Sequence, residues 1–135
     1  MREGKNVIIL ADDDQDDLSI INEIFSLHAH DLTIISVQNG EETLQAIERL
    51  QQQQITPCLI ILDVNMPKLN GRQTLLRIKQ NDQLSNVPLV LFSTSSDPRD
   101  KEFAKRNGAS YVVKPFSYEN LKSVVQWFID QCAVH

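Results

Sequence analysis

The chain has 135 residues, a length that suits one domain built around one hydrophobic core. Hydrophobic residues make up 41% and charged residues 23%, which excludes a disordered chain, and no apolar run approaches the ~20 residues of a membrane span. The formal net charge of −5 argues against nucleic acid as a direct partner, because phosphate binding favours a basic face.

The N-terminal residues contain no long apolar segment that ends in small residues, so they show no secretory signal, and we expect a cytoplasmic protein. The two cysteines, Cys58 and Cys132, lie at the edges of apolar segments. We interpret them as small buried or half-buried hydrophobes rather than as a disulfide or a metal-binding pair.

Short apolar runs and helical stripes alternate five times along the chain. The runs predict strands at residues 7–11, 32–37, 59–63, 88–92 and 110–113. The stripes predict helices over residues 18–25, 41–51, 71–80, 98–107 and 121–132. The helix over 98–107 has a thin apolar face, mainly Phe103 and Ala104, which predicts a helix that can shift. Trp127 lies off the apolar stripe of the last helix.

Five such βα units predict an α/β fold with a parallel sheet covered by helices on both faces. We expect a single domain over residues 1–135, a doubly wound, flavodoxin-like (βα)5 sandwich with strand order 2-1-3-4-5. This order makes the first and third strands neighbours at the topological switch point. It therefore places Asp12 and Asp13 beside Asp63, which ends the fully apolar third strand.

Three carboxylates at one strand end would repel each other unless a cation lies between them. Their hard oxygen ligands suit Mg²⁺, or Mn²⁺ in its place. For Asp14, Asp16 and Asp17 we prefer a helix cap and a solvated turn.

Two further strand ends point to the same edge of the sheet. Ser93 offers a hydroxyl after the fourth strand, and Lys114 offers an ammonium after the fifth. A carboxylate, a cation site, a hydroxyl and an ammonium together suit attack on phosphorus, with Asp63 as the nucleophile that forms an acyl phosphate.

The ordered set of motifs resembles the receiver domain of bacterial two-component response regulators. It comprises Asp12-Asp13, Asp63-Val64-Asn65-Met66-Pro67, Ser93-Thr94, Tyr111 and Lys114-Pro115-Phe116. The resemblance covers essentially the whole chain. Because the residues after Lys114 leave no room for an output domain, we expect a stand-alone, chemotaxis-type (CheY-like) member.

The resemblance implies a role for each motif residue. Asp63 would accept the phosphoryl group, and Lys114 would contact it. Asp13 would bind Mg²⁺ directly, Asp12 through water, and Asn65 through its backbone carbonyl.

The remaining roles concern the switch and its reset. Ser93 and Tyr111 would form the switch pair, and the bond between Lys114 and Pro115 would be cis. Asn65 and Ser95, two positions after the acceptor and the switch residue, would tune dephosphorylation. Both side chains are small and polar, so we expect a moderately short-lived phosphoaspartate.

The resemblance also implies partners. A histidine kinase or a phosphotransfer protein would supply the phosphoryl group. A downstream protein would bind the face made by the fourth helix, the fifth strand and the fifth helix. Trp127 is a candidate on that face, although a ring lying over a helix edge explains it equally well.

Three other functions share part of this pattern. A hydrolase of the haloacid-dehalogenase type shares the nucleophile and Mg²⁺, but it requires an aspartate where this chain has Asn65. A flavodoxin-like FMN carrier requires a phosphate loop rich in Ser, Thr and Gly, whereas residues 12–17 are five acids and a glutamine. A receiver-like binding module that is never phosphorylated would not need the full set of motif positions.

Overall fold

The structure is a computed structural model, and it describes residues 6–28 and 31–133. The five strands are β1 (Asn6–Ala11), β2 (Leu32–Val37), β3 (Leu59–Asp63), β4 (Leu89–Ser93) and β5 (Ser110–Val113). The helices are α1 (Gln15–His28), α2 (Gly40–Gln52), α3 (Gly71–Lys79), α4 (Pro98–Arg106) and α5 (Tyr118–Ala133), with a short 3₁₀ helix η1 (Asp82–Leu84). In this part of the chain no helix is both long and apolar enough to cross a membrane.

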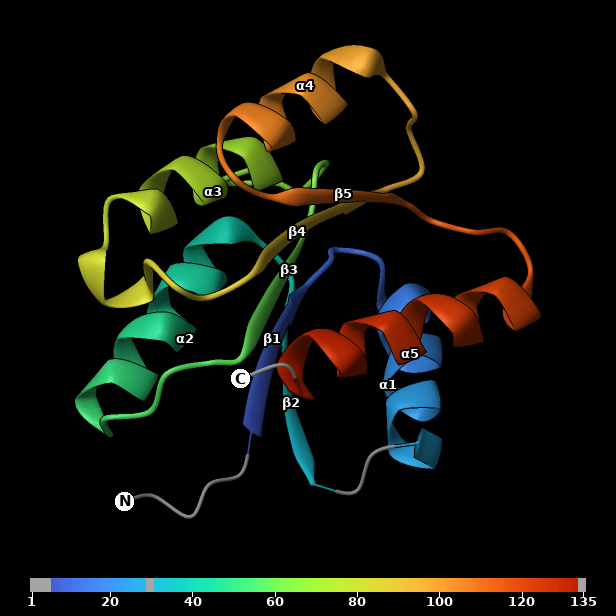
Figure 1. The fold of residues 1–135 in the computed structure, drawn as a ribbon, viewed down its shortest axis with the longest axis horizontal. Helices are drawn as coiled ribbons and strands as arrows, with labels where there is room; N and C mark the ends of the chain where they lie inside the picture. The colour runs from blue at the N-terminus through green and yellow to red at the C-terminus, as the bar shows by residue number, and fades with distance from the viewer. Residues whose placement is uncertain (1–5, 29–30, 134–135) are drawn as a thin grey trace.

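All strand pairs are parallel, and the order is β2-β1-β3-β4-β5, as the sequence predicted. Helices α1 and α5 cover one face of the sheet, and α2, α3 and α4 cover the other (Figure 1). Side chains of the central strands alternate between the two faces. In β3, for example, Leu59 and Ile61 pack under α1 and α5, while Ile60 and Leu62 pack under α2 and α3. This alternation explains why the central strands are apolar throughout.

An aromatic cluster anchors α5 to the sheet. The ring of Phe128 lies edge-on to Phe92 of β4, with centroids 5.4 Å apart, and stacks against Phe25 of α1 at 6.4 Å. Trp127 is half-buried against the same core, with its ring centroid 5.8 Å from that of Phe128. This packing agrees with a ring that lies over a helix edge, and a docking role for Trp127 stays a prediction.

Helix α4 has the thin apolar face that its sequence predicted. Its buried residues are Phe103 and Ala104. Arg72 of α3 also holds it from outside, with its guanidinium carbon 4.6 Å from the centre of the Phe103 ring and an ion pair to Asp100 at 3.7 Å. Because the guanidinium is half-exposed, this contact adds little stability beyond that of the small apolar interface of the helix.

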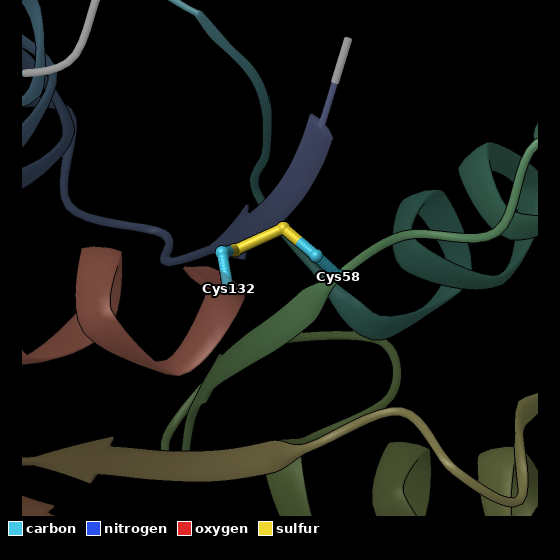
Figure 2. The surroundings of a disulfide bond; sticks show 2 residues. All are labelled: Cys58 and Cys132. Atoms are coloured by element: carbon cyan, nitrogen blue, oxygen red, sulfur yellow. A yellow bond between two sulfur atoms is a disulfide. The ribbon is translucent and has the colours of Figure 1, made fainter. Parts of the chain in front are cut away.

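The cysteine prediction was wrong in one respect. Cys58 and Cys132 are both buried, as expected, but they form a disulfide that joins the residue before β3 to the end of α5 (Figure 2). Their Cα atoms lie 5.0 Å apart although 74 positions separate them in the sequence. Only the packing of α5 beside β3 brings them together, and neither apolar segment reveals this packing by itself.

Candidate functional site

Neighbouring strand ends bring the predicted acids together. Asp63 is the last residue of β3, and Asp12 follows the last residue of β1. These strands pair in parallel with Ala11 opposite Leu62, so the two aspartates leave the sheet side by side. Both are buried, with 1% of Asp12 and 7% of Asp63 exposed. The strand order predicted from the sequence therefore positions the acids as expected.

Gly71, the first residue of α3, packs directly against the end of β3. A Cβ atom at this position would collide with the carbonyl oxygen of Asp63 and would lie 2.8 Å from the Cα of Val64. The Gly71 amide also donates a hydrogen bond to the Val64 carbonyl at 3.0 Å. Glycine is required here for close approach, which lets the helix begin immediately behind the reactive carboxylate.

Three carboxylates form a compact acidic cluster. Asp12, Asp13 and Asp63 each offer an oxygen, and these oxygens lie within 4.8 Å of one another. Asp13 is exposed, so the cluster is open to solvent on its side. Such a set of hard oxygens fits a divalent cation that keeps part of its water shell. The backbone carbonyl of Asn65 stays a predicted further ligand.

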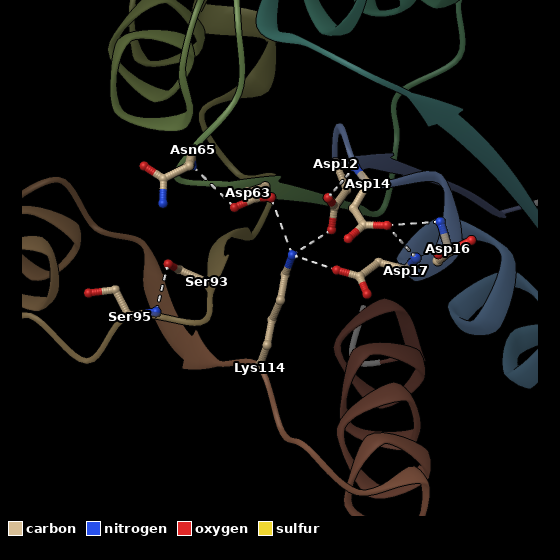
Figure 3. Close-up of polar contacts among 9 residues, drawn as sticks. All are labelled: Asp12, Asp14, Asp16, Asp17, Asp63, Asn65, Ser93, Ser95 and Lys114. Carbon is tan, nitrogen blue, oxygen red and sulfur yellow. Dashed lines mark hydrogen bonds and ion pairs between the residues drawn. The ribbon is translucent and has the colours of Figure 1, made fainter.

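Lys114 neutralises part of this charge (Figure 3). Its Nζ donates to Oδ2 of Asp12 at 2.7 Å, to Oδ2 of Asp17 at 3.0 Å and to Oδ2 of Asp63 at 3.2 Å. An ammonium has three N–H donors, so all of them are engaged. The lysine side chain is 11% exposed. The lysine that the sequence predicted for this site at the end of β5 is thus the cation at its centre.

Asp17 is the residue that the sequence interpretation missed. We expected Asp14, Asp16 and Asp17 to serve only in a helix cap and a solvated turn. Asp14 does cap α1, since its Oδ1 accepts from the amides of Asp16 at 2.9 Å and Asp17 at 3.3 Å. The carboxylate of Asp17, however, points to Lys114. Its i+3 position after the cap was a signal that it faces back toward the strand end.

The surroundings shift the proton affinities of the central pair. Burial raises the pKa of Asp63 to about 7; the Lys114 ammonium opposes this, and the negative charge of Asp12 adds to it. Burial by itself would lower the pKa of Lys114, but its hydrogen bond to Asp12 and the charges of Asp63 and Asp12 outweigh burial and raise that pKa. Lys114 therefore stays charged, while Asp63 ionises more readily when a divalent cation lies beside it.

Ser93, Ser95 and Tyr111 form a connected group next to the acids. Ser93 ends β4 and is fully buried, and its Oγ accepts a hydrogen bond from the Ser95 amide at 3.1 Å. The Tyr111 hydroxyl donates to the Ser95 carbonyl at 2.6 Å, and its ring is half-buried against the core under α4. This network links the predicted switch residues through the backbone of Ser95. Their switching roles stay predictions.

Asn65 contacts the acceptor through its backbone. Its amide donates to Oδ1 of Asp63 at 3.1 Å, while the residue itself is exposed. Thus Oδ1 of Asp63 faces the Asn65 amide and Oδ2 faces Lys114. The side chain of Asn65 lies at the edge of the site, where its predicted effect on dephosphorylation can be tested.

The expectation of a cis bond between Lys114 and Pro115 was wrong, because no cis peptide occurs within residues 6–28 and 31–133. The trans form is intrinsically favoured before proline by about 0.5–1 kcal/mol. Lys114 reaches its three carboxylates from this trans backbone, and its amide donates to the Ser93 carbonyl at 2.7 Å.

Comparison with known proteins matches residues 8–126 to the response regulator receiver domain. The response regulator Rcp1 of Synechocystis sp. is 36% identical over 70% of this chain and 65% of its own length. The protein FilR2 of Methanothrix harundinacea, described as a probable methanogenesis regulatory protein, is 37% identical over 52% of this chain and 46% of its own length. The chain therefore spans less than two thirds of these curated relatives.

Solved structures agree with the sequence match. The phosphorylated cyanobacterial phytochrome response regulator RcpA has a TM-score of 0.87 at 25% identity, covering 97% of this chain and 96% of its own. The Mn²⁺-bound form of Rcp1 has a TM-score of 0.77 at 31% identity, covering 91% of each chain. The chain belongs to the response regulator receiver family of two-component signalling.

Proposed function

We propose that this receiver domain is phosphorylated on Asp63 by a histidine kinase or a phosphotransfer protein. The single observation that carries the proposal is the convergence of Asp63, the acidic pair Asp12 and Asp13, and Lys114 at one strand end. The transfer is catalysed by the receiver's own residues. The protein is a signalling switch, not an enzyme that turns over a metabolite.

The chemistry is a displacement at phosphorus. A carboxylate oxygen of Asp63 forms a bond to phosphorus as the bond from phosphorus to the donor histidine nitrogen breaks, and the histidine leaves as a neutral imidazole after taking up a proton. The product is an acyl phosphate. Lys114 lies 3.2 Å from Oδ2 of Asp63, where its ammonium can pair with a phosphoryl oxygen.

The acidic cluster would hold Mg²⁺, with Mn²⁺ able to replace it. When bound, the cation neutralises charge on the phosphoryl oxygens. Asp13 is the exposed member of the cluster and would provide a direct ligand, while the buried Asp12 would orient a bound water. The carbonyl of Asn65 would complete the protein ligands.

Phosphorylation would change the face made by α4, β5 and α5. Ser93 is the switch hydroxyl of this proposal. Its Oγ accepts from the Ser95 amide, and the Tyr111 hydroxyl donates to the carbonyl of the same residue, so Ser95 connects the two side chains. If Ser93 turned to a phosphoryl oxygen, this loop and the thinly anchored α4 would shift together. Such a change moves a two-state population that a downstream protein reads, and no direct contact with nucleic acid or membrane is required.

The sequence does not support a hydrolase of the haloacid-dehalogenase type. That chemistry needs a general acid two positions after the nucleophile, and Asn65 at this position is an amide without an acidic proton. With Asn65 and Ser95 both small, water can reach the acyl phosphate, so we expect it to be lost within less than hours, and a phosphate-release time course that shows persistence for a day would contradict this.

The test is incubation with acetyl phosphate and Mg²⁺, followed by intact mass spectrometry. We expect the wild type to gain one phosphoryl group, and we expect no gain in Asp63→Asn or when EDTA replaces the cation. Asp16→Asn removes an exposed charge from the first turn of α1, close in sequence to the acidic pair, and serves as a control that should still be phosphorylated. A wild type that never gains mass would refute the proposal.

A further inference from the structure

Lys114 has more carboxylate partners than the phosphoryl chemistry requires. Of the three acids that it contacts, Asp12 and Asp63 also belong to the cluster that would bind the cation. Asp17 lies outside that cluster and contacts Lys114 from the first turn of α1, at 3.0 Å. Lys114 and a divalent cation therefore compete for two acids, and Asp17 is a partner for which they do not compete.

The position of Asp17 is well defined although its side chain is 37% exposed. Asp14 fixes the start of α1 by accepting hydrogen bonds from the amides of Asp16 and Asp17. A carboxylate in the first turn of a helix is also favoured by the partial positive charge of the helix N-terminus. Asp17 thus offers Lys114 an anionic partner on the α1 side of the site.

We propose that Asp17 is a positioning residue that holds the Lys114 ammonium on the α1 side, so that Asp12, Asp13 and Asp63 remain available to a divalent cation. This inference rests on the proposed function. When the cation takes Asp12 and Asp63, two of the three lysine hydrogen bonds weaken, and the bond to Asp17 keeps the ammonium beside the acceptor. Without the Asp17 carboxylate, the ammonium pairs only with Asp12 and Asp63, and a cation must displace it.

Asp17→Asn should weaken Mg²⁺ binding for two reasons. The site loses one negative charge, and Lys114 becomes a stronger competitor for the cluster. Since Asp17 is partly exposed, solvent screens each effect. We expect Mg²⁺ binding to weaken about five-fold, which corresponds to about 1 kcal/mol.

The experiment is isothermal titration of the folded, unphosphorylated protein with Mg²⁺, repeated with Mn²⁺. Asp16→Asn is the matched control, because it removes the same charge from the same helical turn and its carboxylate does not contact Lys114. We expect Asp17→Asn to weaken binding about five-fold, Asp16→Asn to change it less than about two-fold, and Asp17→Glu to restore most of the affinity. Equal effects of Asp16→Asn and Asp17→Asn would overturn the proposal, because net charge alone would then explain them.

A double-mutant cycle tests whether Asp17 acts through Lys114. In a Lys114→Met background, Asp17→Asn should weaken Mg²⁺ binding no more than Asp16→Asn does. A full five-fold effect in that background would show that Asp17 acts on the cation directly, and it would refute the positioning role. Circular dichroism and thermal unfolding of each variant confirm that the titrated protein is folded.

The wild-type arm separates this inference from the proposed function. If the wild type takes up phosphate from acetyl phosphate and binds Mg²⁺, but Asp17→Asn binds it equally well, only the role of Asp17 fails. If the wild type neither binds a divalent cation nor gains a phosphoryl group, the proposed function fails as well.

Discussion

Replacing Asp63 with asparagine should make the metal-free protein more stable at alkaline pH and should leave its stability nearly unchanged in acid. The pKa of Asp63 rises from an ordinary value of 3.8 to about 7, mainly because the carboxyl is buried. The folded protein therefore holds a proton on this residue between about pH 3.8 and pH 7, while the unfolded chain has released it. Stability from Asp63 is complete below that window and is lost as the pH rises through it.

The size of the effect follows from the same shift. One pKa unit corresponds to about 1.4 kcal/mol. Raising the pH from about 5 to about 8 should therefore lower the wild type's free energy of unfolding by about 3 kcal/mol, because folded Asp63 loses its proton over this range. Asparagine resembles the protonated carboxyl and does not titrate. The Asp63→Asn variant should therefore gain about 3 kcal/mol relative to the wild type between these two pH values.

The assay is urea denaturation at both pH values in EDTA, with the free energy of unfolding compared between wild type and variant. Adding Mg²⁺ should reduce the advantage of the variant at pH 8, because a cation that binds the folded wild type stabilises it. A stability difference that does not vary with pH would refute the reasoning. It would show that Lys114 holds Asp63 ionised in the folded protein.

Three further predictions concern the scaffold. Reducing the disulfide between Cys58 and Cys132 with dithiothreitol should lower the free energy of unfolding, measured by urea denaturation, by about 4 kcal/mol, the value for closing a loop of this length. The free energy of unfolding of Cys132→Ser should not change with dithiothreitol. Gly71→Ala should push α3 away from the Asp63 carbonyl, slowing uptake of phosphate from acetyl phosphate and destabilising the fold by about 1–3 kcal/mol; unchanged rates would show that α3 does not position the acceptor. Phe128→Ala should lower the free energy of unfolding by about 3–5 kcal/mol in urea denaturation. The folded fraction should bind Mg²⁺ as the wild type does, because the ring lies in the core that α1 and α5 cover, and weakened binding would contradict this expectation.

The strand order and the central site could be predicted because both depend on local patterns. The apolar run before Asp63 marks a buried strand, and the first polar residue after each central strand falls at the same edge of a parallel sheet. Asp12, Asp63 and Lys114 therefore meet as expected. The organisation of residues 1–135 as a receiver without an output domain stays a prediction.

The misses at Asp17 and at the two cysteines share a physical cause, since each depends on the packing of one element against another. The contact of Asp17 with Lys114 joins residues separated by 97 positions, and the disulfide joins residues separated by 74. No local sequence pattern reveals that residues so far apart in the chain are in contact. The helix over 71–80 was predicted, but the close approach of Gly71 to the backbone of Asp63 was not. The cis bond before Pro115 was carried over from the family resemblance, and the trans backbone of this chain delivers Lys114 to the same acids.

The central claim is that Asp63 itself becomes an acyl phosphate. The most direct measurement treats the protein with acetyl phosphate and Mg²⁺, reduces the acyl phosphate with borohydride, and locates the resulting homoserine by peptide mass spectrometry. We predict homoserine at position 63, at a yield that falls when Lys114 is replaced by methionine. Homoserine at Asp12 or Asp13 instead, or at none of the acids while the wild type is folded and loaded with Mg²⁺, would contradict the account.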